Sequence, residues 1–152
     1  MLRIISNSPV ETIKIGSRIA RQLKDGDFVA LIGILGAGKT YFTKGIARGL
    51  GVAKAERITS PSFVLGNLYK GKRLSLFHFD AYRLDKPREL FSLGLDDLLA
   101  GKTVTVLEWA DKLLPLISKN HPKRIIKVGF KVTGKTKRLL TFTGLLNQAG
   151  FH

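Results

Sequence analysis

Apolar residues recur with helical spacing on both sides of one uninterrupted apolar run near the N-terminus. Ser8, Pro9 and Glu11 stand in the order of an N-cap, a first helical position and a capping acid. We therefore expect a helix from Pro9 to Leu23. Its expected core face is made of Val10, Ile13, Ile19, Ala20 and Leu23.

A second helical pattern begins at Lys39, directly after a glycine-rich segment. Phe42, Ile46 and Leu50 recur every four residues and predict the buried stripe of this helix. Gly51 follows the last of them, where a left-handed C-cap is expected.

Alternating or continuous apolar residues predict strands in several short segments. These are Leu2–Ser6, Phe28–Ile32, Phe63–Tyr69, Arg73–Phe79, Val104–Glu108, Ile125–Val132 and Arg138–Thr143. Tight turns at Lys70–Lys72 and Thr133–Lys135 predict two antiparallel hairpins. Further helical regions are expected around Pro87–Leu99 and Asp111–Ser118.

Strands that alternate with helices predict an α/β fold. We expect a three-layer sandwich of the P-loop NTPase kind, whose mixed sheet has a parallel centre and antiparallel flanking strands. At 152 residues the chain has the size of one domain. Residues 1–144 are predicted to form this single domain, and residues 145–152 a C-terminal tail.

The segment Gly33–Thr40 matches the spacing G-x-x-x-x-G-K-T and directly follows the apolar run Phe28–Ile32. Glycines let backbone N–H groups converge on phosphates, and the next helix points its positive end at the same anion. Lys39 is then expected to reach the β and γ oxygens, and Thr40 to offer its hydroxyl to Mg²⁺. The alternative is a glycine-rich turn without a ligand. The strand context favours a nucleoside triphosphate site.

Two acids end apolar strands and are candidates for holding Mg²⁺ or the attacking water. Glu108 ends the cleaner strand, is followed by a helix and precedes Trp109, so we assign it to the metal. Asp80 is then expected to orient water through position and charge. For either acid, the alternative is a carboxylate that caps the next segment.

Two further features carry weaker signals. Thr59–Phe63 could be a loop that senses the γ-phosphate, or an ordinary turn rich in Ser, Thr and Pro. Arg83 could stabilise charge on the transferred phosphoryl group, or could be a surface arginine.

Composition limits the partners and the compartment. The chain has no cysteine, so it can form no disulfide or thiolate metal site, and we expect a cytoplasmic protein. No apolar stretch approaches the roughly 20 residues that cross a bilayer. The net charge of +15 points to polyanions, although basic residues are dispersed and a solvated surface explains them equally well.

Four motifs together resemble the bacterial TsaE (YjeE) family, the ATPase component of tRNA threonylcarbamoyladenosine biosynthesis. They are the loop Gly36–Thr40, the T-S-P-S-F segment at Thr59–Phe63, the H-x-D-x-Y-R segment at His78–Arg83, and the pair Glu108–Trp109. Their order and spacing agree from about Glu11 to Gly144.

The resemblance implies a weak ATPase that uses ATP and Mg²⁺ and works with the two other proteins of a threonylcarbamoyl-transfer complex. That complex modifies the adenosine beside the anticodon of tRNA. The resemblance neither requires nor excludes a direct contact between tRNA and the basic surface of this chain, and the alternative is an indirect contact. The resemblance implies Thr40 and Glu108 as Mg²⁺ ligands, and Lys39, Asp80 and Glu108 as catalytic residues. The nucleotide contacts that it implies are Thr12, Leu35, Gly36, Ala37, Gly38, Lys39, Thr40, Asp111 and Arg138.

Two positions depart from the family pattern. Ile34 stands where the family generally has an acidic or polar residue, and Tyr41 replaces a small hydroxyl residue. Neither change removes a phosphate contact made by the loop backbone, Lys39 or Thr40.

Other P-loop classes fit less well. A small-molecule kinase needs a lid with arginines, and no arginine-rich lid segment is evident. A guanine-nucleotide switch needs an N-K-x-D motif, which Asn67–Lys70 does not match. A basic nucleic-acid-binding module whose loop merely holds phosphate remains a third alternative, and it predicts no hydrolysis.

Overall fold

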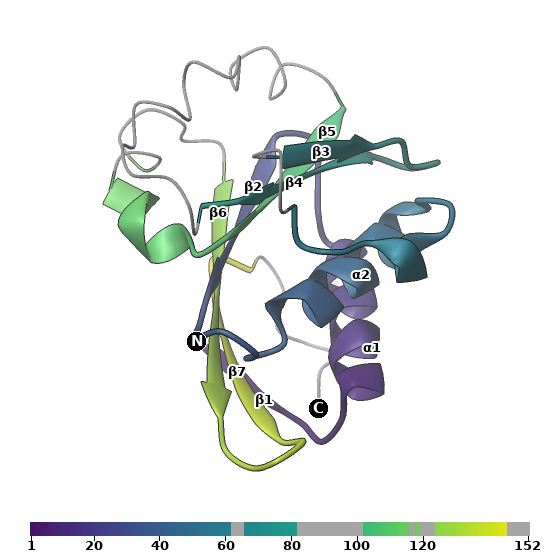
Figure 1. Ribbon diagram of the computed structural model, residues 1–152. Coiled ribbons are helices and arrows are strands. Elements are labelled where there is room, and N and C mark those ends of the chain that lie inside the picture. The colour runs from purple at the N-terminus through teal and green to yellow at the C-terminus, as the bar shows by residue number, and fades with distance from the viewer. Residues whose placement is uncertain (62–65, 82–101, 116–117, 119–123, 146–152) are drawn as a thin grey trace.

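The computed structural model describes residues 1–61, 66–81, 102–115, 118 and 124–145 (Figure 1). Within them, one mixed sheet of seven strands runs in the order β1-β7-β6-β2-β5-β4-β3. The strands are β1 (Leu2–Ser6), β2 (Asp27–Ile32), β3 (Gly66–Tyr69), β4 (Ser75–Asp80), β5 (Thr103–Glu108), β6 (Arg124–Val132) and β7 (Arg138–Thr143).

The sheet has the predicted parallel centre and antiparallel flanks. Strands β6, β2, β5 and β4 run parallel, whereas β7 and β1 at one edge and β3 at the other run antiparallel to their neighbours. The parallel register aligns Asp80 with Glu108, and Glu108 with Leu31. The carboxyl ends of β4, β5 and β2 therefore meet at one edge of the sheet.

Helices α1 (Pro9–Ala20) and α2 (Lys39–Leu50) lie side by side on one face of the sheet (Figure 1). Their close approach depends on glycines: a Cβ on Gly45 would lie 2.1 Å from the carbonyl oxygen of Ile13, and one on Gly16 2.4 Å from that of Phe42. Backbone contact at this helix pair leaves no room for a side chain. This close contact with α1 fixes the position of α2, and with it the N-terminus of α2 next to the glycine-rich loop.

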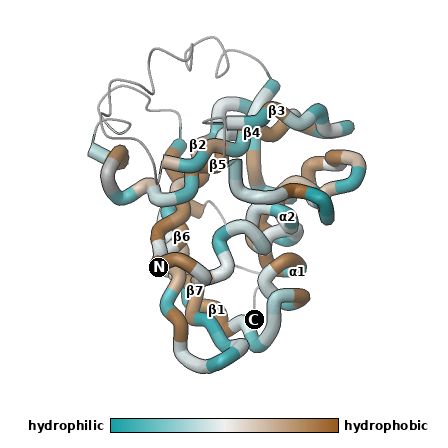
Figure 2. The backbone as a smooth tube through the Cα atoms, viewed as in Figure 1, coloured by the Kyte–Doolittle hydropathy of each residue, from teal (hydrophilic) through white to brown (hydrophobic). Residues whose placement is uncertain are grey.

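Both faces of the central strands are buried, and Figure 2 shows hydrophobic residues along β2, β5 and β6. Val29 and Leu31 pack toward α1 and α2, whereas Phe28 and Ala30 belong to a second cluster on the opposite face. Ala110 of the 3-10 helix η2 (Ala110–Lys112) and Leu113 complete that second cluster. The strands are therefore enclosed between two covering layers, as expected for buried parallel strands.

The first helix differs from the prediction in its end and its buried face. It ends at Ala20, and Val10 is 60% exposed. Nine residues at 100° each place Val10 on the side of the helix opposite Ile19, so these two residues cannot share a face. The buried side is formed by Thr12, Ile15, Gly16, Ile19 and Ala20.

The predictions for α2 and for the two hairpins are confirmed, whereas the segment expected as a helix from Asp111 begins with the 3-10 helix η2, and the strand expected from Arg73 begins at Ser75. α2 begins at Lys39, and Gly51 adopts a left-handed φ of 83° as its C-cap. The pairs β3/β4 and β6/β7 form antiparallel hairpins. The helical region expected around Pro87–Leu99 lies outside the described residues, as do Arg83, residues 116 and 117 of the expected helix 111–118, and residues 146–152 of the tail.

Candidate functional site: a phosphate loop facing two strand-end carboxylates

The loop Gly33–Gly38 connects the end of β2 to the start of α2. Gly36 and Gly38 have left-handed φ angles of 77° and 101°, a region in which side chains are strained. These glycines let the chain turn sharply into the helix. The free N–H groups of the first turn of α2 then face the hollow above the loop, which is the geometry of an anion site.

Lys39, the first residue of α2, turns its ammonium group back over the loop. Its Nζ donates hydrogen bonds to the carbonyl oxygens of Gly33 at 2.7 Å and Ile34 at 2.9 Å. The same nitrogen lies 4.0 Å from the centroid of the Trp109 ring. The lysine is thus held by its own loop and by an aromatic face.

The charge of Lys39 is destabilised by its surroundings. Burial lowers the pKa of Lys39 below its usual 10.5, and the negative charges of Glu108, Asp80 and Asp111 oppose that decrease. A polyanion beside Nζ would add to the effect of the three carboxylates. A bound phosphate would therefore stabilise the charged form of Lys39.

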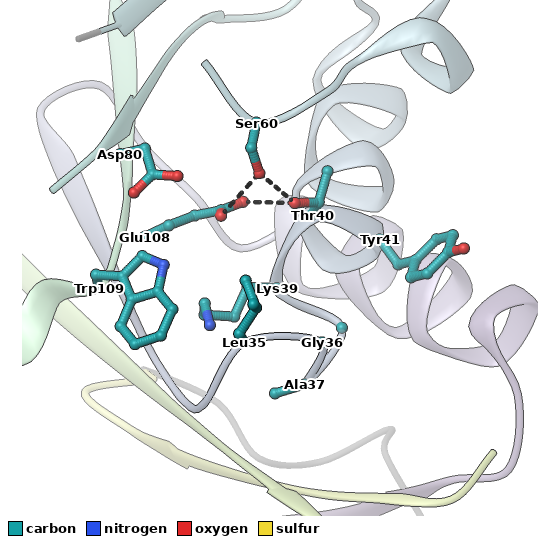
Figure 3. A pocket seen from close by; sticks show the side chains of 11 residues that line it. Leu35, Gly36, Ala37, Lys39, Thr40, Tyr41, Ser60, Asp80, Glu108 and Trp109 are labelled. Atoms are coloured by element: carbon teal, nitrogen blue, oxygen red, sulfur yellow. Dashed lines mark hydrogen bonds between the residues drawn. The ribbon is translucent and has the colours of Figure 1, made fainter. Parts of the chain in front are cut away.

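Glu108 lies at the centre of a buried hydrogen-bond cluster (Figure 3). Thr40 Oγ1 donates to Glu108 Oε1 at 3.1 Å, and Ser60 Oγ donates to Oε2 at 3.3 Å. The Thr40 and Ser60 hydroxyl oxygens are 2.8 Å apart. The structure thus brings the two predicted metal ligands, which are 68 positions apart in sequence, within one hydrogen bond of each other.

His78 supports the same carboxylate from behind. Its Nε2 lies 3.1 Å from Glu108 Oε1, and its side chain is fully buried. Its Nδ1 has no hydrogen-bond partner among the described residues. A ring that carries its proton on Nε2 and donates it to the carboxylate fits this arrangement.

Asp80 lies beside Glu108 at the edge of the sheet where β4 and β5 end. It is paired in register with Glu108 on the adjacent strand, and it lines the same hollow. That hollow measures about 240 Å³. Its lining consists of Leu35, Gly36, Ala37, Gly38, Lys39, Thr40, Tyr41, Ser60, Asp80, Glu108 and Trp109.

Thr12 and Arg138 lie on the outer side of the loop. Both line a smaller hollow of about 70 Å³, together with Gly36, Gly38 and Tyr41. Arg138 donates from Nη2 to the Gly36 carbonyl at 3.1 Å and from Nε to the Ala37 carbonyl at 3.2 Å. This guanidinium group therefore anchors the phosphate loop to β7.

Asp111 lies apart from the other expected nucleotide contacts. It lines a separate hollow of about 510 Å³ on the other side of Trp109. Trp109 lines both hollows and itself has a left-handed φ of 58°, so the chain turns sharply right after Glu108. The negative charge of Asp111 contributes to raising the pKa of Lys39.

His78 and Ser60 lie within the sequence motifs, but the sequence predicts no role for either residue. Residues two apart on a strand share a face, so the position of His78 two residues before Asp80 is a signal that could have identified it. No comparable pattern connects Ser60 to Glu108, because only the fold brings that loop to the end of β5. The two departures from the family pattern, Ile34 and Tyr41, are 65% and 43% exposed, and both line hollows around the loop.

The donors present suit Mg²⁺ more than a transition metal. Among the described residues, no group of three or more His, Cys, Asp or Glu side chains could hold a metal ion alone. One hydroxyl and one carboxylate beside the glycine-rich loop match the few protein ligands that Mg²⁺ takes.

In the part of the chain described, no helix is long and apolar enough to cross a membrane.

Comparisons with known proteins agree with this architecture. The family model described as "Threonylcarbamoyl adenosine biosynthesis protein TsaE" matches residues 6–140. The tRNA threonylcarbamoyladenosine biosynthesis protein TsaE of Treponema pallidum is 36% identical over 140 residues, covering 92% of this chain and 98% of the relative. The protein of the same name from Bacillus subtilis is 38% identical and covers 93% and 84%. A crystal structure of Bacillus subtilis YdiB matches with a TM-score of 0.70 and 36% identity, over 95% of this chain and 85% of that one.

Proposed function

This chain belongs to the TsaE family, and on that premise we propose that it is an ATPase that supports threonylcarbamoyladenosine modification of tRNA. The relatives named above are tRNA threonylcarbamoyladenosine biosynthesis proteins. The proposal extends that role to this chain. It adds ATP with Mg²⁺ as the bound nucleotide, the two other proteins of the transfer complex as partners, and the cytoplasm as the compartment.

One observation supports the nucleotide proposal above all others. The Thr40 hydroxyl, at the first turn of α2, lies 3.1 Å from the Glu108 carboxylate at the end of β5. A hydroxyl from the loop and an acid from the neighbouring strand are the two protein groups that phosphoryl-transfer sites use for Mg²⁺. Mg²⁺, when bound, would neutralise negative charge on the phosphate oxygens.

The other side chains have distinct parts in the proposed reaction. Lys39 exchanges the loop carbonyls for phosphate oxygens and stabilises their charge. Asp80, aligned with Glu108 at the sheet edge, orients a water molecule by accepting its hydrogen bond. His78 and Ser60 hold the Glu108 carboxylate in place. Hydrolysis by this small, open site alone is expected to be slow.

Two variants test the site. We expect Lys39→Ala to abolish nucleotide binding, whereas Glu108→Gln retains much of the binding but loses Mg²⁺-dependent hydrolysis. Arg48→Ala is the matched control, since it removes a positive charge from an exposed position of α2. Hydrolysis is measured with and without the partner proteins from the same organism. Normal hydrolysis by both site variants would show that the site is misassigned.

Trp109 gives a direct binding signal because the chain has one tryptophan. Its ring lies 4.0 Å from the Lys39 ammonium group, which must move to contact phosphate. ATP with Mg²⁺ is therefore expected to change the fluorescence of the protein. A kinase would show the same change but transfer phosphate to an added acceptor, and a phosphate-holding nucleic-acid module would show no hydrolysis with any partner.

A further inference from the structure

Strands β1, β7 and β6 leave one face uncovered by the described helices. α1 and α2 lie on the other side of these strands (Figure 1). Directly paired residues share a face, so the register identifies which side chains project from the uncovered side. This open sheet face consists of Arg3, Ile5, Lys127, Gly129, Lys131, Leu139, Thr141 and Thr143.

The opposite face of the same strands is fully packed. Leu2, Phe142 and Val128 are paired across the three strands and buried against the helices. On the open sheet face, by contrast, Ile5 is 61% exposed, and the Arg3 and Lys131 side chains are also exposed. Alternate side chains of these strands therefore point into the packed core on one face and toward solvent on the other.

Charge on the open sheet face has one sign. Arg3, Lys127 and Lys131 are all exposed, and no strand position of this face carries a carboxylate. Asp111, at the edge beside Trp109, is the acid that lines the adjoining hollow. Together with the net charge of +15, this arrangement favours a polyanionic ligand.

The shape of the surface favours RNA over an acidic protein. The hollow of about 510 Å³ is lined in part by Gly129, Thr141 and Trp109. A strand glycine leaves bare backbone where a ligand can approach closely, and a Cβ there would lie 2.7 Å from Thr141 Oγ1. Threonine hydroxyls can bond phosphates and ribose hydroxyls, and the accessible part of the half-buried Trp109 ring can contact a base.

We propose that the open sheet face binds the sugar-phosphate backbone of tRNA, with Arg3, Lys127 and Lys131 as phosphate contacts. The choice of tRNA as the RNA rests on the proposed function. The surface adjoins the hollow that contains Lys39, Thr40 and Glu108, because Trp109 lines both hollows, but Arg3, Lys127 and Lys131 do not line that hollow. Contact with RNA would therefore not compete directly with nucleotide at the phosphate loop.

The test compares two triple variants of the full chain with equal loss of charge. Arg3→Ala/Lys127→Ala/Lys131→Ala removes the cations of the open sheet face. Lys14→Ala/Arg21→Ala/Arg48→Ala removes three exposed cations from the helical side of the molecule. Binding to an unmodified tRNA transcript is followed by fluorescence anisotropy over a series of salt concentrations, and thermal unfolding shows that both variants remain folded.

We expect the face variant to bind tRNA about tenfold or more weakly, and its log Kd to depend on log salt with a slope smaller by about 2 to 3. The helix-side variant should stay within about threefold of the unsubstituted protein. A single Lys131→Glu substitution should weaken binding in the same direction, and it guards against misfolding of the triple variant. Equal losses in both triple variants would mean that charge alone attracts RNA, and would overturn the proposal.

Two further outcomes keep this proposal distinct from the others. If the face variant binds tRNA normally but no longer retains the partner proteins, the surface is a protein interface and the RNA assignment is wrong. Nucleotide binding is measured by Trp109 fluorescence on separate samples of the same variants without tRNA. A face variant that loses tRNA but keeps ATP supports the RNA surface, whereas an unsubstituted protein that binds tRNA but not ATP contradicts only the ATPase proposal.

Discussion

The imidazole of His78 and the carboxylate of Glu108 form a buried pair, with Nε2 3.1 Å from Oε1. The two residues come from neighbouring parallel strands, β4 and β5. Glu108 also accepts hydrogen bonds from Thr40 and Ser60, so each oxygen has a partner even though the residue is 2% exposed. A buried carboxylate is tolerable only with such partners.

Removing His78 should therefore affect both stability and turnover. We expect His78→Ala to lower the free energy of unfolding by about 1–3 kcal/mol, because a buried acceptor loses its donor and a cavity is left. Turnover should fall with little change in ATP affinity, since His78 lies outside the hollow. Urea unfolding and Mg²⁺-dependent hydrolysis measure the two effects. His78→Gln, which keeps an N–H donor, should restore part of the turnover. Equal turnover in the Ala and Gln variants would argue against a positioning role.

Arg138 should control the shape of the phosphate loop. Its guanidinium group bonds the carbonyls of Gly36 and Ala37 at once, which the single ammonium group of lysine cannot reproduce with the same planar geometry. We expect Arg138→Lys to weaken ATP binding about tenfold, a loss comparable to one charge-assisted hydrogen bond. Lys137→Ala, at the adjacent exposed position, is the control. Titration of Trp109 fluorescence with ATP measures both, and unchanged affinity in Arg138→Lys would refute the anchoring role.

Gly45 should be irreplaceable although it lies inside a helix. Alanine is intrinsically better than glycine there by about 1 kcal/mol, but its Cβ would lie 2.1 Å from the Ile13 carbonyl oxygen. We expect Gly45→Ala to destabilise the protein by about 2 kcal/mol or more, because α1 and α2 must move apart. Arg48→Ala, on the exposed side of the same helix, should change stability by no more than about 0.5 kcal/mol. A Gly45→Ala protein with unchanged or raised Tm would contradict the close packing.

The buried ammonium group of Lys39 should make stability depend on alkaline pH. Burial lowers the pKa of Lys39 in the folded protein below its usual 10.5, so between these two values the unfolded chain binds more protons than the folded one. The free energy of unfolding should then rise with pH across this window, relative to a Lys39→Met variant that has no titrating group. Urea unfolding of both proteins from neutral pH to about 10.5 measures the difference. Parallel curves would show that the lysine is not destabilised in the fold.

Local structure was largely predictable because short-range physics determines it. The apolar run into Gly33–Thr40 predicted the loop and the start of α2 at Lys39, and Gly51 predicted its end. The prediction that Val10 and Ile19 share the buried face of the first helix is wrong, because the helical period places Val10 opposite Ile19. Glu108 and Asp80 could be named as strand-end acids from the sequence, which did not reveal that their strands pair in register.

The sequence by itself determined most candidate site residues, because turn glycines, strand ends and helix starts depend on a few neighbouring positions. Only the tertiary structure decided how those residues meet. Contacts such as Thr40 to Glu108 and His78 to Glu108 depend on the order and register of strands far apart in the chain. The open sheet face also depends on the tertiary structure. The alternation of residues along β6 predicts which residues share a side, but the placement of α1 and α2 decides which side is buried and which stays exposed.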